Sequence, residues 1–334
     1  MKHHRQRGAA LLIALMLVAS MVVLTSSLML SQQVSLRRTA NIINGDQAKL
    51  FTLAAENLGM LLLKRDLKDT PNDHMGEDWA LSSLTGVDIP IPGFEHLPEQ
   101  DQPSVNVRIQ DLNSRFNLNN LINKKGQAST KDLEMFKRLL RTIGLSEVEN
   151  IANSIVDWVD KDIDPTFPDG AEDNDYMGLE IPYRAANQLF ISPTELYLVK
   201  GMTPQIYEKL FPFIAVLPTR TKINVNTATA ELLTSISDSL TMKDAQEIVK
   251  ERDEKFKQSG FAKLDQFIKL NVIGALVKKD KKLLALITEK FSVQSDYFLV
   301  TSMAQYGEGR MNLYSVVARD KKKVRVVVRG QGSY

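Results

Sequence analysis

The sequence predicts an α+β fold in which one helix and an antiparallel sheet form a domain that a large helical insertion interrupts. Three observations predict it. A long apolar helix begins the chain, strand patterns lie on both sides of the middle of the sequence, and the middle itself, roughly residues 120–290, carries helical patterns. Because the strand patterns are so far apart, the middle segment is inserted into the sheet domain.

Composition narrows the class of protein. The chain has 334 residues, of which 43% are hydrophobic and 25% are charged, as in soluble globular proteins. A largely disordered chain and a multi-spanning membrane protein are therefore not expected. The formal net charge of +2 does not indicate a nucleic-acid binder. The absence of cysteine excludes disulfides, thiolate zinc sites, iron–sulfur clusters and cysteine nucleophiles.

The N-terminal segment has a short basic head followed by a long run without charged residues. A basic head with Lys2, Arg5 and Arg7 precedes a run without charge, within which Ala9–Leu30 is mostly apolar. At about 1.5 Å per residue this run can cross a hydrocarbon core of about 30 Å. The bases before it favour a cytoplasmic N-terminus, although Arg37 and Arg38 weaken that signal.

Three interpretations of this segment are open: a signal anchor, a conventional secretory signal peptide, and a prepilin leader. Gly8 lies between the basic head and the apolar run, which resembles the type IV prepilin leader, cut before an apolar segment that is kept. The pilin family usually has Glu at the fifth mature position, where this chain has Ile13. An uncharged residue there suits a subunit with no neighbour ahead of it.

Helical spacing continues beyond the apolar run, from Leu50 to Leu62, with a plausible kink at Asn41–Gly45. The turn formers of Asp69–Gln102 then predict a long, partly ordered connection. Alternation over Val105–Ile109 predicts a half-buried strand.

Three further strands are predicted near the C-terminus. They are expected at Ser292–Met303, Met311–Arg319 and Lys323–Arg329, with short polar turns between them. Short turns between strands are typical of an antiparallel meander.

Residues 157–175 form an acidic cluster with eight carboxylates and one base, Lys161, a local charge of −7. The carboxylates belong to Asp157, Asp160, Asp162, Asp164, Asp169, Glu172, Asp173 and Asp175. The segment is either a solvated loop or a cation site, and oxygen-only ligands in a flexible loop favour Ca²⁺. It is not an EF-hand, because Pro165 and Ala171 occupy the required Gly and Glu positions. The interleaved Trp158, Phe167 and Tyr176 favour a packed loop that binds metal.

Helical hairpins follow. Ser192–Glu195 is a capping box, and a related pattern opens at Thr227, which resembles helix-hairpin-helix modules. DNA binding is not expected, because the first hairpin has only Gly201 and the second has none at 237–242. The sequence contains none of the metalloprotease, serine-hydrolase or phosphate-loop motifs. We therefore do not expect an enzyme.

Taken together, the chain resembles the K-type minor pseudopilins of type II secretion systems (general secretion pathway protein K). The resemblance is carried by the leader and by Asp111–Leu121, Asp157–Asp160, Gly170–Asp173 and Asn224–Ala228. It implies a type IV pilin-like fold, a long helix packed on an antiparallel sheet, with an inserted helical domain containing the hairpin repeats. The implied parts are a leader at 1–8, a transmembrane and filament-core helix at 9–36, a pilin-like domain at 37–120 plus 290–334, and the insertion at 121–289.

The resemblance also implies a function. Prepilin peptidase would cut between Gly8 and Ala9 and methylate the new amine. The helix, with Ala9, Ile13 and Leu30 on it, would hold the chain in the bacterial inner membrane, N-terminus cytoplasmic and bulk periplasmic. The chain would join the I- and J-type minor pseudopilins, and through them the H- and G-types, at the pseudopilus tip. The insertion would cap the filament sterically, favouring initiation and limiting its length.

One or two calcium ions are implied in the acidic cluster. The implied ligands are Asp160, Asp162, Asp164, Asp169, Glu172 and Asp173, with Asp157 and Asp175 as further candidates. Two alternatives remain from the residues: a membrane-anchored DNA-binding helix-hairpin-helix protein, and an anchored extracytoplasmic hydrolase that uses the acidic cluster.

Overall fold

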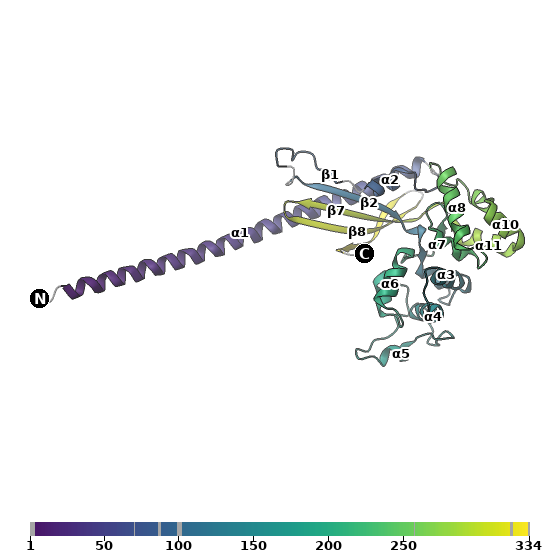
Figure 1. The fold of residues 1–334 in the computed structure, drawn as a ribbon, viewed down its shortest axis with the longest axis horizontal. Coiled ribbons are helices and arrows are strands. Elements are labelled where there is room, and N and C mark those ends of the chain that lie inside the picture. Colours follow the sequence, from purple (N-terminus) through teal and green to yellow (C-terminus); the bar gives the residue numbers. More distant parts are fainter. Residues whose placement is uncertain are drawn as a thin grey trace.

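A long helix, a sheet and a helical insertion make up the computed structural model, which describes residues 4–69, 71–85, 88–98, 102–256, 258–320 and 323–332. The N-terminal half of the helix projects away from the rest of the chain. The insertion lies at the opposite end of the molecule from the N-terminus (Figure 1). The α+β fold class with an inserted helical domain is therefore confirmed.

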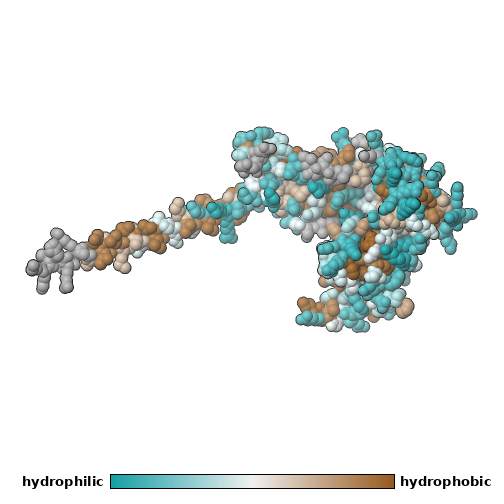
Figure 2. Space-filling model, viewed as in Figure 1, coloured by the Kyte–Doolittle hydropathy of each residue, from teal (hydrophilic) through white to brown (hydrophobic). Residues whose placement is uncertain are grey.

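Helix α1 (His4–Asp69) runs without interruption for 66 residues, about 100 Å at 1.5 Å per residue. The helix continues without a break through Asn41–Gly45, where a kink was expected. Its first half is long and apolar enough to cross a membrane, and its most apolar window is fully exposed. Figure 2 shows the apolar surface concentrated on this projecting part. Of the expected leader, residues 1–3 lie outside the described part of the chain.

The second half of α1 packs on the sheet through small and aliphatic residues. Ala48, Ala55 and Leu63 are buried on the side that faces the strands. At Gly59 an added Cβ would come within 2.8 Å of the Val300 side chain, so glycine lets the helix approach the sheet closely.

The sheet has five antiparallel strands in the order β1-β2-β7-β8-β9 (Figure 1). Their bounds are β1 (Ile89–Pro90), β2 (Ser104–Asp111), β7 (Tyr297–Tyr306), β8 (Gly309–Arg319) and β9 (Val324–Gln331). The predicted meander is thus β7-β8-β9, and the predicted strand at Val105–Ile109 lies in β2. The strand β2 pairs directly with β7, although about 185 residues separate their facing ends.

Two of the predictions for this domain were wrong in part. The strand expected to start at Ser292 starts at Tyr297, because β6 (Phe291–Ser292) pairs instead with β5 (Ile223–Asn224) of the insertion. The connection expected after Asp69 contains helix α2 (Asp78–Thr85). This helix is held by Trp79, which is 1% exposed and packs edge-on against Phe298 with ring centroids 5.1 Å apart.

Between β2 and β7 the chain forms the insertion, which is mainly α-helices and short 3₁₀ helices (η). The expected boundaries, 121 and 289, lie inside this stretch. Its elements are η2 (Leu112–Ser114), β3 (Phe116–Asn117), η3 (Leu118–Leu121), α3 (Thr130–Thr142), α4 (Val148–Val159), α5 (Asp173–Met177), η4 (Pro193–Leu198), α6 (Pro204–Leu210), η5 (Phe211–Phe213), β4 (Ile214–Ala215), β5, α7 (Ala230–Leu233), η6 (Thr234–Ile236), α8 (Met242–Lys255), α9 (Leu264–Ile268), α10 (Asn271–Lys279), α11 (Lys281–Lys290) and β6.

The helix openings predicted for the hairpins are present. Ser192 and Glu195 form the predicted capping box, but the helix that follows, η4, is 3₁₀ rather than α. The second opening is capped two residues after its first Thr, by Thr229, which accepts a hydrogen bond from Leu232 N at the start of α7.

A buried carboxylate ties the insertion to the sheet. Asp111, at the end of β2, accepts hydrogen bonds from Asn113 N (2.7 Å), Thr227 Oγ1 (2.5 Å) and Ser295 Oγ (2.7 Å). Burial raises the pKa of Asp111 to about 6, although these hydrogen bonds oppose the shift. One side chain therefore joins β2, the insertion and the segment that leads into β7.

Asn113 repeats this linkage from the next turn. Its Nδ2 donates to Lys222 O (2.9 Å), and its Oδ1 accepts from Asp296 N (3.2 Å) and Tyr297 N (3.1 Å). The side-chain amide thus replaces backbone pairing where the chain leaves and re-enters the sheet.

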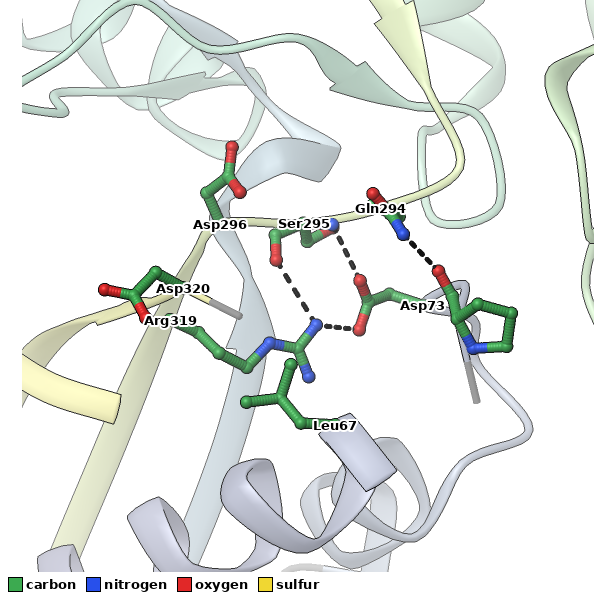
Figure 3. A pocket seen from close by; sticks show the side chains of 8 residues that line it. Leu67, Asp73, Gln294, Ser295, Asp296, Arg319 and Asp320 are labelled. Carbon is green, nitrogen blue, oxygen red and sulfur yellow. Dashed lines mark hydrogen bonds and ion pairs between the residues drawn. The ribbon is translucent and has the colours of Figure 1, made fainter. Parts of the chain in front are cut away.

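The second tie is Arg319, at the end of β8 (Figure 3). It is 6% exposed and pairs with Asp66 of α1 (2.6 Å) and with Asp73, and its guanidinium lies 4.5 Å from the Phe298 ring centroid. It also donates to Ser295 O (3.2 Å), whose amide in turn donates to Asp73 (2.7 Å). The end of α1, the sheet and the start of the return strand are held by this one side chain.

We predict that Arg319→Met destabilises the protein by about 3–5 kcal/mol, because two carboxylates stay buried without their cation. Urea unfolding of the detergent-solubilised chain, followed by tryptophan fluorescence, measures the loss. The matched control is Arg310→Met on the same strand, where the side chain is exposed and the expected change is about 0.5 kcal/mol or less. Equal losses for the two variants would contradict the role given to Arg319.

Candidate functional site

The acidic cluster lies between α4 and α5, at the end of the insertion farthest from the sheet (Figure 1). Aromatic rings pack directly beside it. Trp158 and Tyr176 meet edge to face with centroids 5.3 Å apart, and Tyr183 stacks on Tyr176 at 5.3 Å. The segment is therefore packed around Trp158 and Tyr176, as predicted, but the prediction was wrong for Phe167, which is 93% exposed.

Asp157 closes the loop through backbone amides. Its side chain is fully buried and accepts from Thr166 N (3.1 Å) and Ala171 N (2.7 Å). An added Cβ on Gly170 would lie 2.1 Å from the Asp157 carboxylate, so only glycine fits there. Asn153 adds a hydrogen bond from its Nδ2 to Pro168 O (2.7 Å). The carboxylate oxygens of Asp157 are thus engaged in hydrogen bonds that hold the loop, and the same lone pairs are not free for a metal ion.

Three carboxylates converge within the loop so formed. One oxygen from each of Asp160, Asp162 and Glu172 lies within 4.8 Å of the other two. Asp160 is 4% exposed and Glu172 is 2% exposed, whereas Asp162 faces solvent. Among the described residues, Asp160 Oδ1 and both carboxylate oxygens of Glu172 are buried without a hydrogen-bond partner.

The electrostatics of these groups are unfavourable without a cation. Burial raises the pKa of Asp160 to about 7, with further contributions from the charges of Asp162 and Asp157. Burial and the neighbouring aspartates raise the pKa of Glu172 to about 8. Two buried, unpaired carboxylates beside a third are costly, and a bound divalent cation removes that cost. The donor set, oxygens only, fits a hard ion such as Ca²⁺, with backbone carbonyls and water completing the coordination.

The remaining predicted ligands lie elsewhere in the loop. Asp164 and Asp169 are exposed, and the Asp169 backbone has φ 61°. Asp173 accepts from Ala185 N (3.0 Å). Asp175 accepts from Glu172 N (3.1 Å) and pairs with Lys200 (2.6 Å). The structure therefore brings three of the eight carboxylates together and uses Asp157, Asp173 and Asp175 to hold the surrounding backbone.

A second candidate surface lies on α1, beyond its most apolar part. Ile43, Leu50 and Leu61 are between 53% and 60% exposed, although they belong to the half of the helix that packs on the sheet. Their spacings of 7 and 11 residues place them on one line along the helix, away from the buried Ala55 and Leu63. This part of α1 thus has two apolar faces, and one is exposed.

A membrane-length N-terminal helix that packs on an antiparallel meander defines a type IV pilin-like protein, here with a large helical insertion. Residues 114–219 and 223–287 match two family models, both described as type II secretion system (T2SS), protein K. The chain is 34% identical to type II secretion system protein K of Pseudomonas aeruginosa, over 98% of this chain and 93% of the relative. It is 32% identical to the protein of the same name from Aeromonas hydrophila, over 97% and 96%.

The fold matches a solved structure as well. A chain in the crystal structure of the GspK-GspI-GspJ complex from the enterotoxigenic Escherichia coli type 2 secretion system superposes with a TM-score of 0.74 at 24% identity, covering 89% of this chain and 100% of that one. The chain belongs to the type II secretion system protein K family, the K-type minor pseudopilins. It is thus a structural subunit with one N-terminal helix suited to single-pass membrane anchoring.

Proposed function

We propose that this chain forms the tip of the periplasmic pseudopilus with the I- and J-type minor pseudopilins, which link it to the H- and G-types. Two observations support the proposal. The structural neighbour was solved as a GspK-GspI-GspJ complex. The exposed apolar side chains of Ile43, Leu50 and Leu61 lie on one line beyond the membrane segment of α1 and give a partner helix separate apolar contact points.

The position of the insertion carries the capping role. The insertion lies at the end of the molecule opposite the N-terminus and extends to one side of the α1 axis (Figure 1). Subunits in a filament stack along their parallel helices, so a further subunit above this one would meet the insertion. Steric capping needs no catalytic group, and it favours initiation while limiting filament length.

The charge pattern supports the proposed topology. Before assembly, α1 holds the chain in the inner membrane with its N-terminus cytoplasmic and its bulk periplasmic, because bases precede the apolar run. Prepilin peptidase cuts between Gly8 and Ala9 and leaves the apolar segment on the mature chain. The expected N-methylation removes no charge from the new amine.

We further propose that Asp160, Asp162 and Glu172 hold a calcium ion that fixes the acidic loop. The unpartnered, buried oxygens of Asp160 and Glu172 are the observation that supports this site. The chain has no cysteine, so a bound cation takes the place of a disulfide as a cross-link in an exported domain.

Replacing Leu50 and Leu61 by Asp should abolish co-purification with the I- and J-type pseudopilins, because charges would enter an apolar helix interface. Tagged pull-down from membranes that co-express the three subunits measures this. Leu284→Asp is the control, since Leu284 is 42% exposed on the insertion and lies off the proposed interface. Full recovery of both partners with the double variant would contradict the proposed surface.

Gly8→Ala should leave an uncut precursor when the chain is expressed with prepilin peptidase, because the peptidase reads the glycine before the cut. Intact-mass spectrometry of the purified chain distinguishes precursor from mature protein. Gly45→Ala in the same helix is the matched control, as an added Cβ there meets nothing within 4 Å. Normal cutting of the Gly8 variant would exclude this processing route.

Removal of calcium should lower the melting temperature. At a calcium concentration one hundred times the dissociation constant, binding stabilises the folded state by about 2.7 kcal/mol. The double variant Asp160→Asn, Glu172→Gln should lose this response, whereas Glu308→Gln, at an exposed hairpin, should keep it. Melting curves with calcium and with chelator, together with elemental analysis, test the site. A chelator response in the double variant that equals that of the parent chain argues against these ligands.

A further inference from the structure

A cavity of about 430 Å³ lies in the insertion, next to the acidic loop, and it shares Val159 and Lys161 with that loop but none of its carboxylates. Four segments far apart in the sequence form it: 119–126, 159–161, 187–189 and 218–220. Its walls are mainly apolar, with Ile122, Val159, Leu189 and Pro218 among them. Apolar concave sites of this size, with a few polar groups, are where proteins bind ligands.

Two ammonium groups lie at this cavity. Lys124 and Lys161 both line it and are exposed. Lys161 lies between Asp160 and Asp162 in the sequence, whereas Lys124 lies between Asn123 and Lys125. The Lys161 stem passes over Gly126, where an added Cβ would lie 2.9 Å from Lys161 Cδ. The third cation, Arg220, is already paired with Asp132 (2.6 Å). The cavity therefore presents positive charge beside an apolar wall.

Asn187 adds to the cavity a hydrogen-bond acceptor that no described residue donates to. Its backbone has φ 48° and its amide donates to Trp158 O (3.0 Å), which fixes the residue at the end of α4. Its Oδ1 is buried and has no hydrogen-bond partner among the residues described. A buried acceptor of this kind is expensive unless a ligand or water donates to it.

We propose that this cavity is a docking site for a polypeptide segment of a partner protein, with an apolar side chain followed by a free carboxylate. The side chain fills the apolar cavity, the carboxylate lies between Lys124 and Lys161, and a peptide N–H donates to Asn187 Oδ1. An aliphatic acid would satisfy the apolar wall and the lysines but offers no N–H. The amide acceptor thus favours a peptide over a fatty acid. The proposal does not depend on the tip position, and because Lys161 lies between Asp160 and Asp162 the calcium concentration is held constant in its test.

The binding experiment uses the full chain in lipid nanodiscs at one fixed calcium concentration. The probe is fluorescein-labelled Gly-Ser-Gly-Ser-Leu with a free C-terminus, followed by fluorescence anisotropy. We expect it to bind about tenfold or more tightly than the same peptide with an amidated C-terminus, or than one ending in Ser. Decanoate, the competing ligand class, should displace it poorly.

Two sets of variants locate the binding. The double variant Lys124→Met with Lys161→Met should lower the affinity for the free-acid peptide to that for the amidated peptide. The control Lys278→Met with Lys282→Met removes the same charge elsewhere and should leave the affinity unchanged. Asn187→Gly keeps the positive φ and removes the acceptor, and should weaken both peptides. Circular dichroism melting of each variant confirms that it is folded.

Each other outcome overturns the proposal. Equal affinity for the free-acid and the amidated peptide would show that the carboxylate is not recognised. An unchanged affinity in the variant Lys124→Met with Lys161→Met would place binding elsewhere. Decanoate that binds and displaces the peptide fully, with no effect of Asn187→Gly, assigns the cavity to an anionic amphiphile instead. Absence of measurable binding of every peptide rejects a peptide site.

Discussion

The insertion is possible because two strands that are neighbours in the sheet hold both of its ends. β2 ends at Asp111, which pairs with Phe298 of β7, so the chain leaves and re-enters the sheet at one place. Backbone pairing stops there, and buried polar side chains take over. Asp111 and Arg319 each join segments from the sheet and from outside it. These polar ties give the insertion one orientation, which an apolar contact alone would not specify.

The acidic loop shows how one chemical group, the carboxylate, takes two roles. Asp157 is fully buried yet satisfied, because backbone amides from its own loop donate to it. Glu172 is almost as buried, and neither of its carboxylate oxygens has a hydrogen-bond partner among the described residues. The first carboxylate folds the loop, and the second is one of the ligands of the proposed cation site. The density of carboxylates in the sequence predicts a cation site. Only the hydrogen-bond partners seen in the structure separate the proposed ligands from the carboxylates that hold the loop.

Local patterns predicted the parts of the fold that depend on neighbouring residues. Alternation gave the strand at Val105–Ile109 and the C-terminal meander, and the apolar run gave α1. Helix α2 was missed, because its anchor, Trp79, packs on Phe298 about 220 residues away. The calcium ligands stay a prediction, but the partners of Asp173 and Asp175 beyond the loop could not be read from a local pattern for the same reason. The cavity needs four distant segments, and no local pattern indicates it.

The two ends of α1 bear on the same proposal. At the N-terminus, Ile13 stands where pilins usually carry the Glu that pairs with the amine of a neighbouring subunit, and Ile13 is 60% exposed on an apolar helix. A subunit without that carboxylate has nothing to offer a preceding amine. At the other end, the proposed role has the insertion in the space where a subunit ahead would stack. Both features fit the proposed position at the filament tip, since the first removes a contact that a subunit ahead would need and the second leaves that subunit no room.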